Sequence, residues 1–192
     1  MSKIISHKTI QIGTGEIRPD FPNQFFDQIL AFLGYGFCKC IWEEEWVDIK
    51  PSGMDSVFSI KLSALRPGDR IWAPTSKGKD DWVLVSNIFK KEEEIYKVSF
   101  ENGLECHTSM EHKYLCEDGE KRPLWEVLEK DLEVKTEKNS SKVLSVVKMG
   151  KKNVVDLTVE DPLHCFYAGG VAVSNSHALS ADTEILTLES FG

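Results

Sequence analysis

Several residues along this chain carry side chains that could act on a peptide bond. A cysteine thiol is a strong nucleophile near neutral pH, because its pKa of about 8.5 leaves a few per cent as thiolate. A serine hydroxyl is a weaker nucleophile and needs a positioned base, and histidine is suited to proton transfer near pH 7. The candidates that combine these types are Cys40, Ser109, His112, Asp156, His164, Asn175 and Ser176.

Each of these residues also has an ordinary structural explanation. A single cysteine such as Cys40 is most often a small buried hydrophobe. His112 and His164 could be structural histidines, and Asn175–Ser176 could be a turn. Their functional interpretation therefore depends on their occurring together.

The elements that must position these residues are mostly strands. From about Arg70 the hydrophobic pattern has a period of two, in short runs rich in Val, Ile, Tyr, Phe and Trp. The runs cover residues 70–73, 82–88, 94–101, 104–107, 113–117, 142–149, 153–160 and 165–174. Asn102–Gly103 between two runs indicates a hairpin turn. The pattern predicts an all-β body with one short helix over residues 123–130.

The residues before this body follow a different pattern. Apolar residues recur at helical spacing from Phe25 to Leu33, and Gly34 ends the pattern. This predicts a short helical flank on the amino-terminal side.

Composition restricts the classes of function. The chain has 192 residues, a net charge of −8 and 41% hydrophobic residues, enough for a core. The acidic balance argues against direct nucleic-acid binding, and no apolar run is long enough for a membrane span. Five cysteines without an export signal indicate thiols in a reducing, cytoplasmic compartment.

Taken together, the motifs resemble those of inteins, the Hedgehog/intein (HINT) family of self-splicing elements. The closing segment has a strand with Asp156, a His-x-Phe step at His164, a glycine hairpin, and Asn175 followed by a hydroxyl residue. Residues 65–71 (LRPGDRI) and 103–115 resemble two further blocks of the family. The resemblance implies a horseshoe of short antiparallel strands over residues 40–175, a mini-intein without an inserted endonuclease.

The flanking residues resemble a second protein. Joining residues 34–39 to residues 176–178 gives GYGFCKSHA, which is similar to a stretch of the bacterial DNA polymerase III alpha subunit, with Cys38 in place of Asn. This implies three parts: an N-extein fragment at 1–39, a splicing domain at 40–175, and a C-extein start with a tail at 176–192. The host would then be a DNA replication protein.

The resemblance also implies a role for each candidate residue. Cys40 would attack the carbonyl carbon of Lys39, Ser176 would take over the acyl group, and Asn175 would cyclise. Ser109 would hold the scissile carbonyl, with Thr108 as the neighbour that could substitute, and His112 would protonate the departing amide nitrogen. Asp156 would manage the Cys40 proton, with a raised pKa if buried beside the thiol. His164 would assist cyclisation, the more so because Ser174 stands where the family often has His.

Such a protein would process itself once rather than turn over added substrate. It needs no cofactor, and its own flanking segments are its substrate.

The opening block after Cys40 departs from the family, since it lacks the usual Asp/Glu-Thr step. Residues 178–187 (ALSADTEILT) match that block better, except that Ala178 stands where Cys is usual. The tail could be the first piece of a second, split intein with a complementary partner chain. It could also be the first strand of a permuted intein, which could not form a thioester at Ala178.

Three functions of other classes stay open at the level of sequence. A structural zinc module could use Cys106, His107, His112 and Cys116, although adjacent residues of a strand face opposite sides. A binding module or polymerase accessory fragment would stay intact. A cysteine hydrolase would use Cys40 or Cys165 with a histidine and turn over an added substrate.

Overall fold

The computed structural model describes residues 10–12, 15–17 and 40–175. The chain divides into two units, of which residues 38–178 form one. In the other unit, β1 (Ile10–Ile12) pairs antiparallel with β2 (Gly15–Ile17). The helix expected between Phe25 and Leu33 lies outside the described residues.

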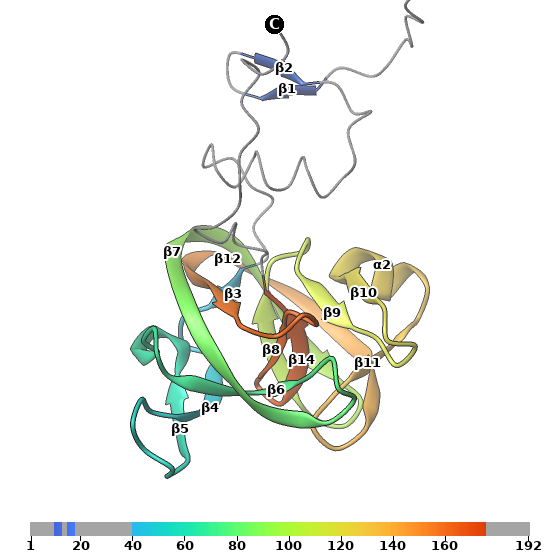
Figure 1. Cartoon of the computed structure of the whole chain (residues 1–192). Coiled ribbons are helices and arrows are strands. Elements are labelled where there is room, and N and C mark those ends of the chain that lie inside the picture. Colours follow the sequence, from blue (N-terminus) through green and yellow to red (C-terminus); the bar gives the residue numbers. More distant parts are fainter. Residues whose placement is uncertain (1–9, 13–14, 18–39, 176–192) are drawn as a thin grey trace, which may run out of the picture. The chain divides into compact units, whose positions relative to one another are not determined.

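The body formed by residues 40–175 is almost entirely strand (Figure 1). Its elements are β3 (Ile41–Trp42), β4 (Trp46–Lys50), β5 (Phe58–Lys61), a 3-10 turn η1 (Leu62–Ala64), β6 (Arg70–Pro74), β7 (Asp80–Phe100), β8 (Glu105–Thr108), β9 (Lys113–Leu115), β10 (Lys121–Pro123), α2 (Leu124–Glu129), β11 (Glu133–Lys135), β12 (Ser140–Val159), β13 (Cys165–Ala168) and β14 (Val171–Ser174). The all-β class is confirmed, and α2 lies within the expected helix.

The strands form two antiparallel sheets in this body. The larger has the order β11-β12-β3-β8-β7-β6-β4-β5, and the smaller has the order β10-β9-β14-β13. In addition, β7 pairs directly with β12. The two sheets together bring segments from both ends of the body into contact with its middle.

The expectation of uniformly short strands is wrong for β7 and β12. The runs expected at 82–88 and 94–101 are parts of one strand of 21 residues, and those at 142–149 and 153–160 are parts of one strand of 20 residues. The two strands pair with each other over most of their length, with register shifts that accommodate their curvature. Hydrogen bonding across this long ribbon continues through the charged residues that break the hydrophobic pattern.

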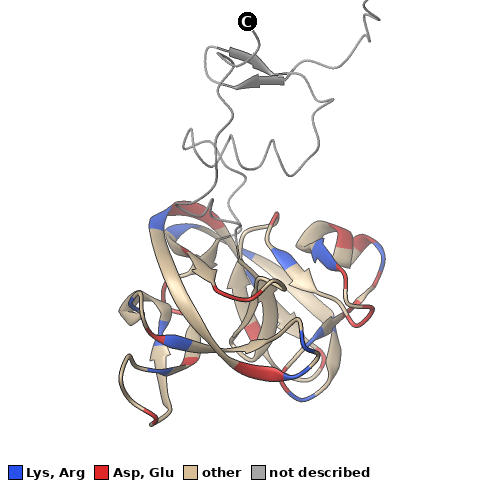
Figure 2. Cartoon of the chain, viewed as in Figure 1, with Lys and Arg blue, Asp and Glu red and all other residues tan. Residues whose placement is uncertain are grey.

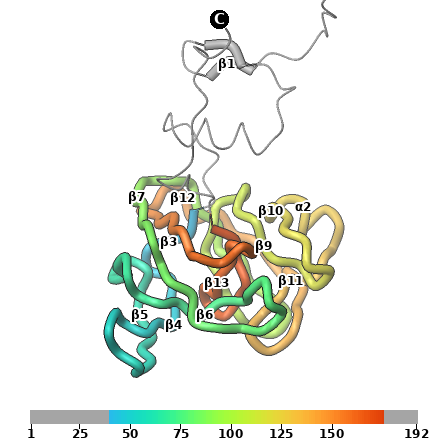
Figure 3. The backbone as a smooth tube through the Cα atoms, viewed as in Figure 1, coloured from blue at the N-terminus to red at the C-terminus, as the bar shows by residue number. Residues whose placement is uncertain are grey.

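The β13–β14 hairpin lies in the middle of the body, where Figure 3 shows it enclosed by the other strands. Every residue of both strands is buried. A strand that is buried on both faces needs apolar residues at successive positions rather than in alternation. Gly169 and Gly170, both at positive φ, make the turn that the sequence predicted there.

Within the body, strands β3, β4, β5, β10 and β11 have no counterpart among the predicted strands. The run Glu43–Glu45 interrupts the apolar pattern, and β3 has only two residues. Burial nevertheless alternates along β4, where Val47 and Ile49 face the core. The core joins these residues to Phe100, Tyr114 and Phe166.

Acidic and basic residues are spread over the described body and do not gather in one patch (Figure 2). No helix in the described part of the chain is long and apolar enough to cross a membrane.

Candidate functional site

Cys40 begins the body and lies between two strands that carry other candidate residues. Ile41 pairs with Val155 of β12 and with Thr108 of β8. One residue earlier, the same registers place Cys40 level with Asp156 on one side and with Ser109 on the other. The backbone N–H of Ser109 donates to the Cys40 carbonyl oxygen at 3.1 Å.

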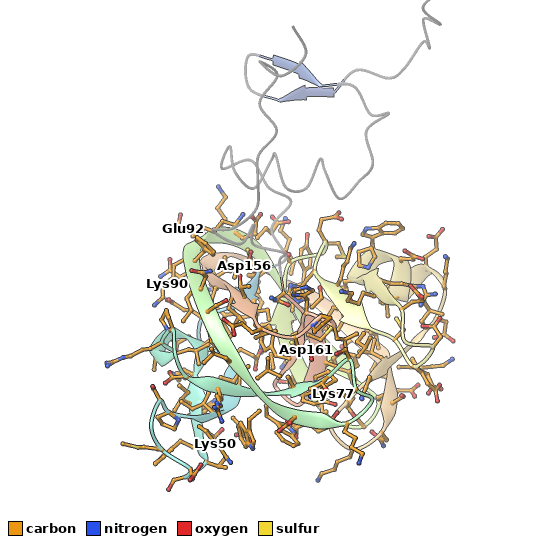
Figure 4. All side chains as sticks on the ribbon, in the orientation of Figure 1. Lys50, Lys77, Lys90, Glu92, Asp156 and Asp161 are labelled. Carbon is orange, nitrogen blue, oxygen red and sulfur yellow. The ribbon has the colours of Figure 1, made fainter. Side chains whose placement is uncertain are left out.

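Cys40 is fully buried, and Asp156 is half-buried. Residues opposite each other in antiparallel strands project to the same face, with Cβ atoms about 4.5–5.5 Å apart. The register therefore sets the thiol and the carboxylate side by side. Figure 4 shows Asp156 at the end of the body where Lys90 and Glu92 of β7 also lie.

The turn after β8 carries His112 into the interior. The His112 N–H donates to the Ser109 carbonyl at 3.1 Å, and the Leu124 N–H donates to the His112 carbonyl at 3.0 Å. His112 is fully buried, with its ring edge-on to Tyr114 at 5.9 Å between centroids. This turn links the Cys40 carbonyl, through Ser109, to the histidine.

Asn175 ends the body beside both candidate histidines. The β13–β14 register pairs Cys165 with Ser174, so His164 comes level with Asn175. The Asn175 N–H donates to the His164 carbonyl at 2.9 Å. On the other side Val173 pairs with Tyr114, and the same register two residues further brings His112 level with Asn175.

His164 has a φ of 48°, a backbone conformation that is uncommon for a residue with a bulky side chain. The Asp161 carbonyl accepts its N–H at 2.9 Å, and Asp161 Oδ1 accepts the Leu163 N–H at 2.8 Å. These bonds hold the turn that brings His164 to the start of β13. Strained backbone of this kind is frequent at functional sites.

The structure thus brings six of the seven candidates to one end of the body: Cys40, Ser109, His112, Asp156, His164 and Asn175. The seventh, Ser176, lies outside the described residues but follows Asn175 directly in the chain. In Figure 3 the two ends of the coloured part of the chain, residues 40 and 175, lie on the same side of the body.

Thr108 and Ser109 have different surroundings. The Thr108 hydroxyl lies 2.7 Å from the Tyr114 hydroxyl, and both groups are buried in the core. Of the two hydroxyl residues, Ser109 is the one whose backbone contacts Cys40.

Sequence reasoning missed Glu45 as a member of this region. Its carboxylate is 5% exposed, and Oε2 lies 2.9 Å from the His107 N–H nitrogen and 2.8 Å from His107 Nδ1. The His107 ring in turn meets the Trp42 ring at 4.9 Å. The run Glu43–Glu45 gives no signal of which carboxylate is buried, so this cluster could not be found from sequence.

The residues of the zinc alternative do not converge. Cys106 packs in the core, whereas adjacent His107 faces Glu45. In the part of the chain that the structure describes, no three His, Cys, Asp or Glu side chains form a group that could hold a metal ion.

The other thiols of the body are also buried. Burial, reinforced by the Glu45 charge, raises the pKa of the Cys106 thiol well above its ordinary range, and burial also raises the pKa of the Cys116 thiol. Cys165 is fully buried and packs with Leu115 and Tyr167.

Comparison with known proteins shows which solved structures share this fold. No protein-family model matches the sequence, and a search of curated proteins finds no relative. Among solved structures, the body is similar to the gp41-1 intein (TM-score 0.58, 20% identity, 71% of this chain and 98% of that chain). It is also similar to a DnaB intein from Synechocystis sp. PCC 6803 (TM-score 0.58, 23% identity, 71% and 98%) and to the VidaL intein (TM-score 0.60, 18% identity, 72% and 98%). The chain therefore shares the HINT fold of these inteins.

Proposed function

We propose that this protein is an intein, which excises residues 40–175 and joins residues 1–39 to residues 176–192. The observation that carries the proposal is the register at the end of the body. It places Cys40 between Asp156 and Ser109, and Asn175 between His164 and His112, with the turn at residues 109–112 linking the two groups. The fold shared with solved inteins supports it further.

In the first step, Cys40 Sγ attacks the Lys39 carbonyl carbon. The C–S thioester bond forms and the amide C–N bond breaks. Asp156, level with Cys40, accepts the thiol proton, and His112 supplies a proton to the released Cys40 amine, so that the number of protons is unchanged. The Ser109 N–H fixes the Cys40 carbonyl and so the orientation of the peptide.

In the second step, the Ser176 oxygen attacks the thioester. An ester C–O bond replaces the C–S bond, and the serine proton returns to sulfur. A fold that holds the two junctions together makes this step intramolecular, which is worth up to about 7–11 kcal/mol in favourable cases. The bonds and protons of this step balance without an external oxidant, metal or nucleotide.

In the third step, Asn175 Nδ2 attacks the Asn175 carbonyl carbon. A succinimide forms, the C–N bond to Ser176 breaks, and the proton from Nδ2 passes to the released Ser176 amine. His164, level with Asn175, assists this proton transfer. The Ser176 amine then attacks the neighbouring ester, which leaves a Lys39–Ser176 amide and restores the serine hydroxyl.

We also propose that the host is a protein similar to the polymerase III alpha subunit, since the ligated junction would read GYGFCKSHA. The position of β3 favours residues 40–175 as the complete unit over the permuted arrangement. β3 follows Cys40 directly and pairs with both β8 and β12.

Mass spectrometry of freshly expressed protein tests the proposal. The wild-type chain is expected to give the excised 40–175 fragment and a ligated peptide that spans Lys39–Ser176. Cys40→Ala removes the first nucleophile and is expected to abolish ligation while cleavage after Asn175 continues. Asn175→Ala is expected to prevent cleavage after residue 175, so that residues 40–175 stay joined to the C-terminal flank.

Three results would contradict these assignments. A wild-type chain that stays intact under reducing conditions at neutral pH would exclude splicing and favour a binding module. Normal ligation by Cys40→Ala would show that Cys40 is not the first nucleophile. Turnover of an added peptide would favour the hydrolase.

A further inference from the structure

Buried Glu45 and partly buried His107 and Trp42 form a cluster beside Cys40 that the mechanism above does not use. Trp42 is two residues after Cys40 on β3, and His107 is two residues before Ser109 on β8. With a period of two, all four side chains share one face. Glu45 comes from the turn that follows β3, where its N–H donates to the Trp42 carbonyl at 3.0 Å.

The Glu45 carboxylate completes a strand ladder that the backbone leaves unfinished. Alternate N–H groups of β8 point toward β3, and that of Ser109 reaches the Cys40 carbonyl. The His107 N–H, two residues earlier, points the same way, and the register sets it level with Trp42. The Trp42 carbonyl accepts the Glu45 N–H, and Glu45 Oε2 accepts the His107 N–H at 2.9 Å in its place.

The same oxygen holds the His107 ring at Nδ1, 2.8 Å away. The ring meets the Trp42 indole at 4.9 Å and 61°. Trp42 packs against the cluster of Cys40, Ile95 and Val154. The Glu45 carboxylate is therefore connected to the surroundings of the Cys40 thiol through the rings of His107 and Trp42.

A strand of two residues has few ladder bonds to fix it, so its side chains must do so. Glu45 also lies against the turn of the central hairpin, where a Cβ on Gly169 would be 3.0 Å from Glu45 Oε1. The Gly169 N–H donates to the Trp46 carbonyl at 2.9 Å. The carboxylate thus touches the segments that lead to Cys40, to Ser109 and to Asn175.

We propose that Glu45 and His107 are a positioning pair that holds β3, through Trp42, so that Cys40 is oriented for the first acyl transfer. The inference rests on the proposed splicing function. It gives this chain a substitute for the Asp/Glu-Thr step that its opening block lacks. Neither residue is a catalytic residue in this proposal, since both act through the position of Cys40.

The test measures the two cleavages separately. In an Asn175→Ala background, thiol-induced cleavage at Lys39–Cys40 reports the first step alone. In a Cys40→Ala background, cleavage after Asn175 reports cyclisation alone. Glu45→Ala, Glu45→Gln and His107→Gln are placed in both backgrounds, and the thermal unfolding midpoint of each variant is recorded.

Glu45→Ala is expected to slow the first cleavage by at least about tenfold, as the loss of a buried charged hydrogen bond allows, and to leave cyclisation nearly unchanged. Glu45→Gln should recover most of the rate, because its amide oxygen can still accept the His107 N–H. His107→Gln should slow the first cleavage selectively, since Trp42 loses its ring contact. Glu44→Ala is the matched control, because Glu44 is on the same turn but pairs with Lys61 at the surface.

The outcomes separate the two proposals. If neither background cleaves with Glu45 intact, the splicing function fails. If the backgrounds cleave but Glu45→Ala and His107→Gln match the Glu44→Ala control, the positioning pair is overturned. Equal slowing of both cleavages with a lower unfolding midpoint would also overturn it, because Glu45 would then have only a structural role. If Glu45→Ala does not fold, Glu45→Gln and His107→Gln decide between these results.

Discussion

Thr108 and Ser109 are adjacent hydroxyl residues, of which the sequence names Ser109 as the candidate and Thr108 as a possible substitute. Strand geometry separates them, because successive side chains of β8 point to opposite faces. Thr108 faces the core and meets Tyr114, whereas Ser109 adjoins Cys40. At this scale, burial and register decide which of two chemically similar groups is available to the site.

Thr108→Val is expected to lower the free energy of unfolding by about 1–3 kcal/mol, because it removes the Thr108 hydroxyl that is hydrogen-bonded to the buried Tyr114 hydroxyl. Urea denaturation measures the change. The double variant Thr108→Val with Tyr114→Phe should recover much of the loss, since both polar groups are then removed. Additive losses in the double variant would show that the hydroxyl pair contributes nothing.

Asp118→Asn should weaken the turn between β9 and β10 in a pH-dependent way. The Arg122 guanidinium, then the Glu120 N–H, lower the pKa of the Asp118 carboxyl below its ordinary value of 3.8. A lowered carboxyl pKa stabilises the folded state above that value, and the contribution is lost as pH falls through the folded pKa.

Thermal unfolding is therefore expected to show a slightly lower midpoint for Asp118→Asn at pH 7, with the difference vanishing once the carboxyl is protonated. The effect is small because the pair is exposed at the surface. Asp55→Asn, at another exposed acidic position, serves as the control. A difference that grows toward acid pH would contradict the assignment.

At the scale of elements, the central hairpin determines how closely the parts of the body approach. Its turn at Gly169 packs on the backbone of β8, and a Cβ there would lie 2.4 Å from the Glu105 carbonyl oxygen. The residue also has a φ of +57°.

Gly169→Ala is expected to destabilise the fold by more than the left-handed backbone alone, which costs about 1–2 kcal/mol. Gly119→Ala is the matched control, because Gly119 has a φ of +84° but nothing within 4 Å of its added Cβ. Calorimetry of both variants separates the cost of the close contacts with Glu105 and Glu45 from the cost of the backbone conformation. Equal losses would mean that β8 moves aside without cost.

At the scale of the whole molecule, the relevant feature is that the first and last strands of the body both pair with strands from its middle. Its first strand lies between β8 and β12, its last pairs with β9, and its described residues form a hydrophobic core cluster. The arrangement has the properties of a unit that can persist after its flanks are removed.

Residues 40–175, expressed alone, are expected to unfold cooperatively and to show a dispersed NMR spectrum. The physical reason is that residues of the body form hydrophobic core clusters with one another. Circular dichroism during thermal unfolding provides the second measurement. A broad, non-cooperative transition would show that the flanking segments contribute to the core.

The sequence by itself determined the all-β class, the helix near residue 124, the turns at Gly103 and Gly169, and the candidate residues. These depend on local hydrophobic period and turn chemistry, which are written along the chain. The length of β7 and β12, the contact of Thr108 with Tyr114, and the burial of Glu45 beside His107 were decided only by the tertiary structure. The strand lengths and the Glu45 contact depend on which strand lies opposite which, and pairing between residues more than 40 positions apart leaves no local pattern.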